Sequence, residues 1–218
     1  MKKLEEKLQK HIHFLISRYP KLEAIQKSIE EAYLLMEECY LHDGKLLIAG
    51  NGGSAADSEH IAGELMKGFK MSRTVTDVYA EKLKAVNPVI GLELAENLER
   101  GLAAIPLVAH EALTTAYIND VSGLGVFAQQ LFVLGRNGDI FLGISTSGNS
   151  RNILKAAVAA RASGIKVIGL TGADGGELAN MADVTVRVPE KETYMVQELH
   201  LPIYHCWCLM LEDYFFGF

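Results

Sequence analysis

The sequence has few cysteines and no long uncharged apolar run, and these two shortages exclude several classes of protein. Its 218 residues include three cysteines, Cys39, Cys206 and Cys208, which are too few for a disulfide framework. On a helix, the thiols of Cys206 and Cys208 point apart, so we expect all three to be reduced core residues. The chain contains no uncharged apolar stretch of about 18 residues, the length that a membrane-spanning helix needs. Because residues 1–7 are charged and unlike a signal peptide, we expect a soluble, cytoplasmic protein.

Positive charge is also in short supply. The chain has 21 Lys and Arg residues against 27 Asp and Glu residues, and its net charge of -6 argues against a nucleic-acid groove. Its composition is 49% hydrophobic, which is enough to bury a full core. We therefore expect a single domain over residues 1–218, with neither a membrane nor a nucleic acid as partner.

Two nucleotide-binding signatures are missing as well, the Gly-x-Gly-x-x-Gly pattern after Gly50 and the P-loop lysine. In their place, an apolar run that ends at Gly50 breaks at Asn51-Gly52-Gly53 and continues as a helix capped by Ser54. The backbone amides of such a strand–loop–helix unit are free to hold an anion. The loop over residues 51–54 is therefore a candidate binding site.

The helix that follows carries His60 and Glu64, four residues apart and therefore on the same side. Such a pair can bind a metal or move protons, but an isolated His-x-x-x-Glu pair is more often a surface interaction. A functional role for it therefore depends on residues elsewhere in the chain.

A second polar loop follows the apolar strand expected at residues 140–144. It places four hydroxyl groups just before a helix, where they and the helix amides can hold a phosphate without a lysine. A Ser/Thr cluster also caps helices without any ligand, but the glycine-rich loop at another strand end favours phosphate binding. The four hydroxyl residues are Ser145, Thr146, Ser147 and Ser150.

Apolar strands alternate with helices along most of the chain, which predicts a parallel sheet covered on both faces, a three-layer α/β sandwich. Ligands in such folds bind at the carboxyl ends of the strands, where both polar loops lie. Helices expected at 3–18 and 21–42 either cover the sheet or contact another subunit. Residues 75–104 have a helical composition interrupted at Asn87-Pro88, so they form two short helices or a mobile excursion. The expected strands are 45–49, 105–109, 140–144, 166–170 and 184–188.

Together, several segments form a pattern: Gly50-Asn51-Gly52-Gly53-Ser54, His60, Glu64, Gly143-Ile144-Ser145-Thr146-Ser147-Gly148-Asn149-Ser150, Leu170-Thr171-Gly172, Gln197-Glu198 and His205. This pattern resembles the sugar isomerase (SIS) domain and, within it, the phosphoheptose isomerases. The resemblance covers about residues 45–212, with 75–104 as an insertion atypical of the family. It implies a five-stranded parallel sheet and a homotetramer with sites between subunits, to which residues 1–43 would contribute an interface. It also implies conversion of sedoheptulose 7-phosphate to D-glycero-D-manno-heptose 7-phosphate.

The resemblance also implies a role for each matching residue. Glu64 and His205 would be the catalytic acid/base pair. The phosphate would be held by Ser145, Thr146, Ser147 and Ser150. The sugar would be bound by Asn51, Gly52, Gly53, Ser54, Thr171 and Gln197. Zinc would be bound by His60, Glu64, Gln197 and His205.

The residue types agree with this chemistry independently of the resemblance. Isomerisation through an enediol needs a base for the proton beside the carbonyl, and an acid or a metal to stabilise the developing oxyanion. Two nitrogen and two oxygen ligands suit tetrahedral zinc, although a Gln ligand is unusual. His200, three residues after Gln197, is a competing candidate on the same helix.

Two departures from the family pattern bear on the substrate. His110 stands where the isomerases usually carry an aspartate, and Gly68 stands where they carry a basic residue, with Lys67 and Lys70 nearby.

A second hypothesis is a non-catalytic SIS protein that binds sugar phosphates or the bacterial replication initiator. Such relatives tend to lose the helical glutamate and the last histidine. Because this chain keeps Glu64 and His205, the sequence favours an enzyme.

Overall fold

The computed structural model describes residues 4–217 and contains one five-stranded sheet, in which all strands are parallel and the order is β2-β1-β3-β4-β5. The predicted fold class, a parallel α/β sandwich, is confirmed. The strands are β1 (Leu46–Ala49), β2 (Ala104–Pro106), β3 (Ile140–Ser145), β4 (Lys166–Thr171) and β5 (Val184–Arg187).

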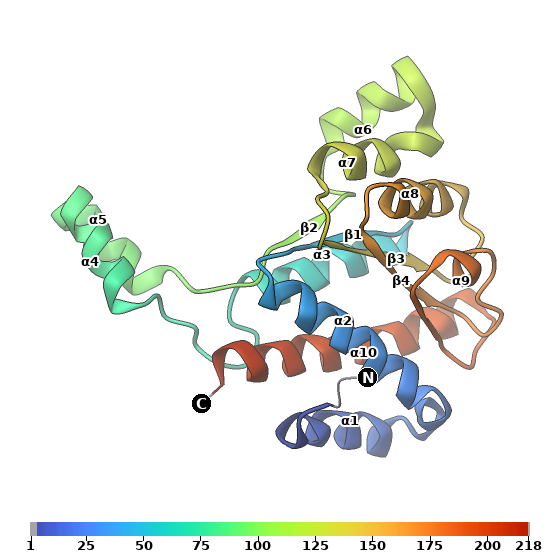
Figure 1. Cartoon of the computed structure of the whole chain (residues 1–218), viewed down its shortest axis with the longest axis horizontal. Coiled ribbons are helices and arrows are strands. Elements are labelled where there is room, and N and C mark those ends of the chain that lie inside the picture. Colours follow the sequence, from blue (N-terminus) through green and yellow to red (C-terminus); the bar gives the residue numbers. More distant parts are fainter. Residues whose placement is uncertain (1–3, 218) are drawn as a thin grey trace.

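Helices cover both faces of this sheet (Figure 1). Alternate residues of β1 show the division, since Leu46 and Ile48 belong to one buried cluster and Leu47 and Ala49 to another. The first cluster includes α1 (Glu6–Arg18), α2 (Gln26–Leu41), α3 (Gly53–Met66) and α10 (Thr193–Phe216). The second includes α7 (Val126–Leu134), α8 (Arg151–Ala162) and α9 (Leu178–Met181). Within residues 4–217, no helix is both long and apolar enough to span a membrane.

Three features differ from the sequence-based expectation. The helix expected to be capped by Ser54, α3, has Gly52 at its N-cap and Gly53 as its first residue. The helix expected at 21–42 begins as a 3-10 turn, Pro20–Ile25, and becomes α-helical only at α2. Residues 111–125 form helical structure that the sequence did not predict, because in the described chain none of these residues is buried and the apolar positions give no one-sided pattern. This structure comprises α6 (Glu111–Tyr117), a π-helical turn (Ile118–Ser122) and a 3-10 turn (Gly123–Gly125).

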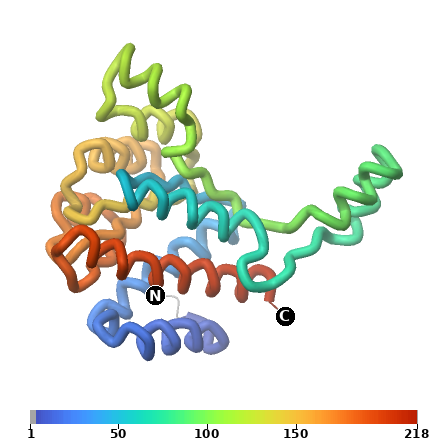
Figure 2. Tube along the Cα trace, turned by 180° about the vertical axis from the view of Figure 1, so that it is seen from behind, coloured from blue at the N-terminus to red at the C-terminus, as the bar shows by residue number. Residues whose placement is uncertain are grey.

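Within residues 75–104, the two short helices α4 (Asp77–Val86) and α5 (Pro88–Asn97) form a hairpin, which we call the α4–α5 arm. The Asn87 side chain caps α5 by accepting from the amides of Val89 and Ile90, at 3.1 and 2.9 Å. The arm extends away from the body of the molecule (Figures 1 and 2). It therefore exposes large apolar side chains, namely Val78, Tyr79, Val86, Val89, Ile90, Leu92 and Leu94.

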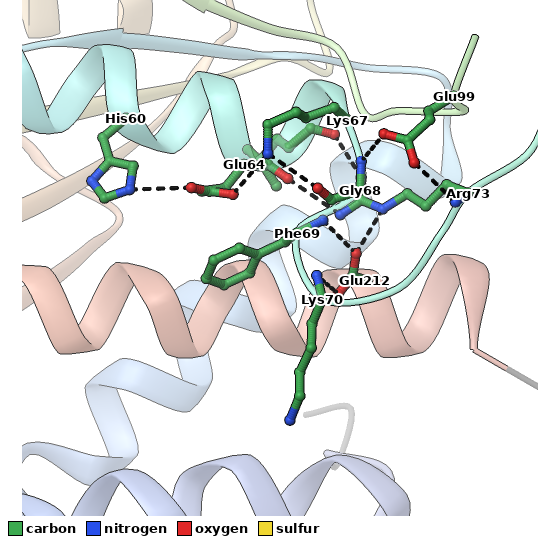
Figure 3. A network of polar contacts seen from close by, with 10 residues as sticks. His60, Glu64, Lys67, Gly68, Phe69, Lys70, Arg73, Glu99 and Glu212 are labelled. Atoms are coloured by element: carbon green, nitrogen blue, oxygen red, sulfur yellow. Dashed lines mark hydrogen bonds and ion pairs between the residues drawn. The ribbon is translucent and has the colours of Figure 1, made fainter. Parts of the chain in front are cut away.

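A buried ion pair joins the segment after α3 to α10 (Figure 3). Arg73 and Glu212 are each 1% exposed, and the Arg73 Nε atom lies 2.9 Å from Glu212 Oε1. The Glu212 carboxylate also accepts from the backbone amides of Phe69 and Lys70, at 2.8 and 2.9 Å. Arg73 Nη2 donates to the backbone carbonyl of Glu64 at 3.2 Å. These contacts attach the end of α3 to α10.

The substitution Arg73→Met should destabilise the fold because it leaves the buried Glu212 carboxylate without a cation. We expect the free energy of unfolding in urea to fall by about 3–5 kcal/mol. Lys191→Met is the control, since it breaks the Lys191–Asp174 pair (3.2 Å), whose side chains are 73% and 74% exposed. The control should lose less than about 1 kcal/mol of its free energy of unfolding. Equal losses in the two variants would show that the buried pair contributes no more to stability than the exposed pair.

Candidate active site

Two polar loops meet at the carboxyl ends of β1 and β3, the neighbouring strands at which the strand order reverses direction. The side chains of Asn51, after β1, and Asn152, after β3, exchange two amide hydrogen bonds of 3.0 and 2.8 Å. The structure therefore brings together the two loops that the sequence placed on one side of the sheet.

The hydroxyl loop after β3 has the features expected of an anion site. Ser145 Oγ donates to Ser150 Oγ at 3.0 Å, and Ser147 Oγ accepts from the backbone amide of Asn149 at 3.1 Å. Ser150 occupies the N-cap of α8, but its side chain makes no capping bond in the described chain. Its hydroxyl is therefore not occupied by the usual structural role of such a residue.

The residues expected to bind the sugar differ in their accessibility. The exposed loop residues Asn51, Gly52 and Gly53 can reach a ligand. Ser54 and Thr171 are buried, and the Thr171 hydroxyl donates to the carbonyl of Gly172 at 3.0 Å. As placed, these two side chains are covered by neighbouring residues and not open to a ligand.

Gln197, on α10, lies against the start of α3. A Cβ atom at Gly53 would overlap the Gln197 side-chain amide, so the glycine permits this close contact. The contact links the loop after β1 to the helix that carries the last predicted site residues.

Further along the same two helices, His60, Glu64 and His205 form a cluster. The His60 Nε2 atom lies 3.2 Å from Glu64 Oε1. The rings of His60 and His205 meet edge-on, with centroids 5.0 Å apart. The Glu64 side chain is 15% exposed and that of His60 is 42% exposed, so the cluster opens to solvent on the His60 side.

The surroundings of His205 favour its neutral form. Burial, followed by the nearby imidazole of His60, lowers the pKa of His205, and the Glu64 carboxylate opposes this shift only in part. Its Nε2 atom is buried and has no hydrogen-bond partner among residues 4–217. An unpartnered buried nitrogen of this kind suits a ligand proton or a cation.

Asp57 and Tyr204 belong to this cluster, although the sequence did not single them out. The Tyr204 hydroxyl donates to Asp57 Oδ1 at 3.1 Å and lies 3.0 Å from His60 Nδ1. Only Asp57 carried a signal in the sequence, since it lies one helical turn before His60.

His200, the competing candidate, lies away from this cluster. It is fully buried, and burial lowers its pKa to about 4, although the adjacent backbone of Thr171 acts in the opposite direction. We therefore assign it to the core.

The two departures from the family pattern have structural partners. His110 Nδ1 contacts Gln130 Oε1 at 2.5 Å, and the buried Gln130 in turn donates to a carbonyl at the end of β2. The amide of Gly68 donates to Glu99 Oε2 at 2.8 Å. Beside it, Lys67 Nζ lies 3.5 Å from Glu64 Oε2 and supplies a cation near the cluster.

The expected zinc ligands are only partly assembled. Gln197, on α10, contacts the start of α3, whereas the cluster of His60, Glu64 and His205 lies further along the two helices. In the described part of the chain, no three His, Cys, Asp or Glu side chains are grouped as a metal site. The unpartnered Nε2 atom of His205 nevertheless fits a cation, and the donor types suit zinc. Zinc binding stays a prediction.

Comparisons with known proteins show which family this chain resembles. The SIS domain family matches residues 12–103 and 99–172. The phosphoheptose isomerase of Aneurinibacillus thermoaerophilus is 38% identical over 89% of this chain and 85% of its own length. That of Sulfurimonas denitrificans is 37% identical over 100% of this chain and 98% of its own.

Two solved structures are similar to this chain over nearly its full length. A phosphoheptose isomerase from Neisseria gonorrhoeae superimposes with a TM-score of 0.72 at 34% identity, covering 97% of this chain and 100% of that one. One from Francisella tularensis gives a TM-score of 0.74 at 31% identity, with 95% and 97% covered. These relatives are named as enzymes, as the retained Glu64 and His205 predict. The chain therefore belongs to the phosphoheptose isomerase family of SIS-domain proteins.

Proposed function

We propose that this chain interconverts sedoheptulose 7-phosphate and D-glycero-D-manno-heptose 7-phosphate through an enediol. The observation that carries this proposal is the Glu64–His60–His205 cluster on the two helices that also bring Gln197 against the glycine-rich loop. The adjoining hydroxyl loop offers a phosphate site at the same edge of the sheet. A cytoplasmic location is part of the proposal.

The two bases divide the proton transfers between carbon and oxygen. The Glu64 carboxylate removes the proton from C1 of the ketose, the C–H electron pair becomes the C1=C2 bond of the enediol, and the C2=O π electron pair moves onto O2. Glu64 then returns that proton to C2. Neutral His205 takes the O1 proton and delivers it to O2, so the aldose forms without net loss or gain of protons.

The remaining residues hold the substrate in position for these transfers. The phosphate is bound by the hydroxyls of Ser145, Thr146, Ser147 and Ser150 and the amides at the start of α8. Because the phosphate is bound at one end of the sugar, C1 and C2 at the other end are held at a fixed distance from Glu64. The sugar hydroxyls meet Asn51 and Gln197.

The site residues also suit zinc. The side chains that would hold it are His60, Glu64, Gln197 and His205, with the free Nε2 atom of His205 as the supporting observation. A bound zinc ion would polarise the oxygen atoms of the substrate.

We propose that the working form is a homotetramer in which the helices within residues 1–43 and the α4–α5 arm contact other subunits. The arm exposes several large apolar side chains, and such a cluster favours contact with another protein surface. A groove of about 310 Å³ between α1 and α10, lined by Phe14, Arg18, Leu209 and His205, lies open beside the cluster. A neighbouring subunit would close it and complete the site.

Glu64→Gln should abolish isomerisation, because the amide cannot accept the carbon-bound proton. We expect a loss of about 100-fold to 10,000-fold in kcat, measured as aldose formed from a panel of ketose phosphates. Binding of the sugar phosphate, followed by calorimetry, should be largely unchanged. Glu59→Gln makes the same change at an exposed position of α3 and should retain full activity. Turnover of no ketose phosphate by the unmodified protein would refute the proposed reaction.

Zinc should copurify with protein prepared from zinc-supplemented medium and should be lost from His205→Ala. The expected result is about one zinc per chain by elemental analysis in the unmodified protein, because the donor set offers one tetrahedral site. Glu59→Gln again serves as control and should retain the metal. Metal-free protein after zinc supplementation would exclude this part of the proposal.

The double substitution Val86→Glu, Val89→Glu should weaken the assembly, since it places charges on the most exposed apolar positions of the arm. Light scattering after size exclusion should show a mass near four times 23.9 kDa for the unmodified chain and a smaller mass for the variant. Lys82→Glu adds a carboxylate to the arm without removing an apolar side chain and should leave the mass unchanged. An unchanged mass in both variants would remove the arm from the interface.

A further inference from the structure

We infer that Asp57 and Tyr204 are positioning residues that fix His60 with its hydrogen on Nδ1 and its Nε2 lone pair toward Glu64. The kinetic consequence of this arrangement rests on the proposed function, whereas the position of the hydrogen does not.

A continuous series of hydrogen-bond contacts crosses two helices, from Asp57 through Tyr204 and His60 to Glu64. Asp57, His60 and Glu64 lie on α3, and Tyr204 reaches between them from α10. The distances are 3.1 Å from Tyr204 Oη to Asp57 Oδ1 and 3.0 Å from Tyr204 Oη to His60 Nδ1. The series ends with 3.2 Å from His60 Nε2 to Glu64 Oε1. Tyr204 is 1% exposed, so water does not compete for its hydroxyl.

The direction of each bond follows from the hydrogens available. A carboxylate can only accept, so the single hydroxyl hydrogen of Tyr204 goes to Asp57. The Tyr204 oxygen then accepts, and the hydrogen it receives comes from His60 Nδ1. A tyrosine hydroxyl ordinarily carries its hydrogen at neutral pH, and its 3.1 Å contact with Asp57 Oδ1 gives that hydrogen an acceptor.

The other nitrogen of His60 is determined by this arrangement. A neutral imidazole carries one hydrogen, so with Nδ1 protonated the lone pair lies on Nε2, facing the Glu64 carboxylate. Two acceptor atoms 3.2 Å apart can hold a cation between them. A histidine whose distal N–H is bound in this way is also more basic and better oriented as a ligand. Asp57 and Tyr204 thus act on Glu64 through His60.

The ring of Tyr204 also packs against neighbouring rings, and the test must distinguish this packing from the hydrogen bonds of the hydroxyl. It packs edge-on against His60 and His205, with centroids 5.5 and 5.0 Å away. Tyr204→Phe preserves this ring and removes only the hydroxyl. It therefore isolates the hydrogen bond from the packing.

The direct test is the ¹⁵N shift of the His60 nitrogens in chelator-treated protein with labelled histidine. The His60 signals are identified by their absence from His60→Gln. We expect a protonated Nδ1 in the unmodified protein and a shift of the hydrogen toward Nε2 in Tyr204→Phe. Tyr33→Phe removes a hydroxyl from another fully buried tyrosine and should leave the signals unchanged. A protonated Nε2 in the unmodified protein, or no change in Tyr204→Phe, would overturn the inference.

Kinetics then test the consequence. Tyr204→Phe should lower kcat about 10-fold to 100-fold with little change in KM and with a melting temperature close to that of Tyr33→Phe. Asp57→Asn retains an oxygen acceptor for the tyrosine hydroxyl and should lose less than Asp57→Leu. Equal losses in these two variants would overturn the positioning role. An unmodified protein that turns over no sugar phosphate but shows Nδ1–H would refute the proposed reaction and support the hydrogen-bond assignment.

Discussion

The packing of α3 against α10 is the constraint on which the candidate site depends. His60 and Glu64 lie on α3, and Gln197 and His205 lie on α10, so neither helix holds a complete site. The helices are joined at one end by the contact of Gln197 with Gly53 and at the other by the buried Arg73–Glu212 pair (Figure 3). Because Arg73 also binds the carbonyl of Glu64, the ion pair fixes the backbone of the proposed base and not only the two helices.

The chain's own sequence was sufficient to predict the parallel sheet and the juxtaposition of the two loops, because apolar strands and the polar residues after them follow local rules. The proximity of His60 and Glu64 follows from helical spacing, whereas that of His205 followed from the family resemblance. Tyr204 could not be predicted, because a tyrosine among apolar residues on a long helix reads as core, and it is also buried. Its role follows only from the crossing of the two helices, which no local pattern specifies.

The two residues that the sequence led us to expect as departures from the family pattern, His110 and Gly68, make hydrogen bonds within the fold. His110 is bonded to Gln130 and so ties the start of α6 to α7, while the amide of Gly68 is bonded to Glu99 at the base of the α4–α5 arm. The cation beside Glu64 is Lys67, whose Nζ atom lies 3.5 Å from the carboxylate. The proposed base therefore has a positive charge near it.

The α4–α5 arm is the part of the described chain that has the least burial of its own. Each of its helices has 10 residues, a length at which an isolated helix is marginal in water. In the described chain, the only buried residue of the two helices is Gly91, so the arm lacks a core of its own. In the proposed assembly, ordering of the arm and its coverage by another subunit would be linked equilibria, and dilution would act on both. Protein concentration would then affect the order of this segment.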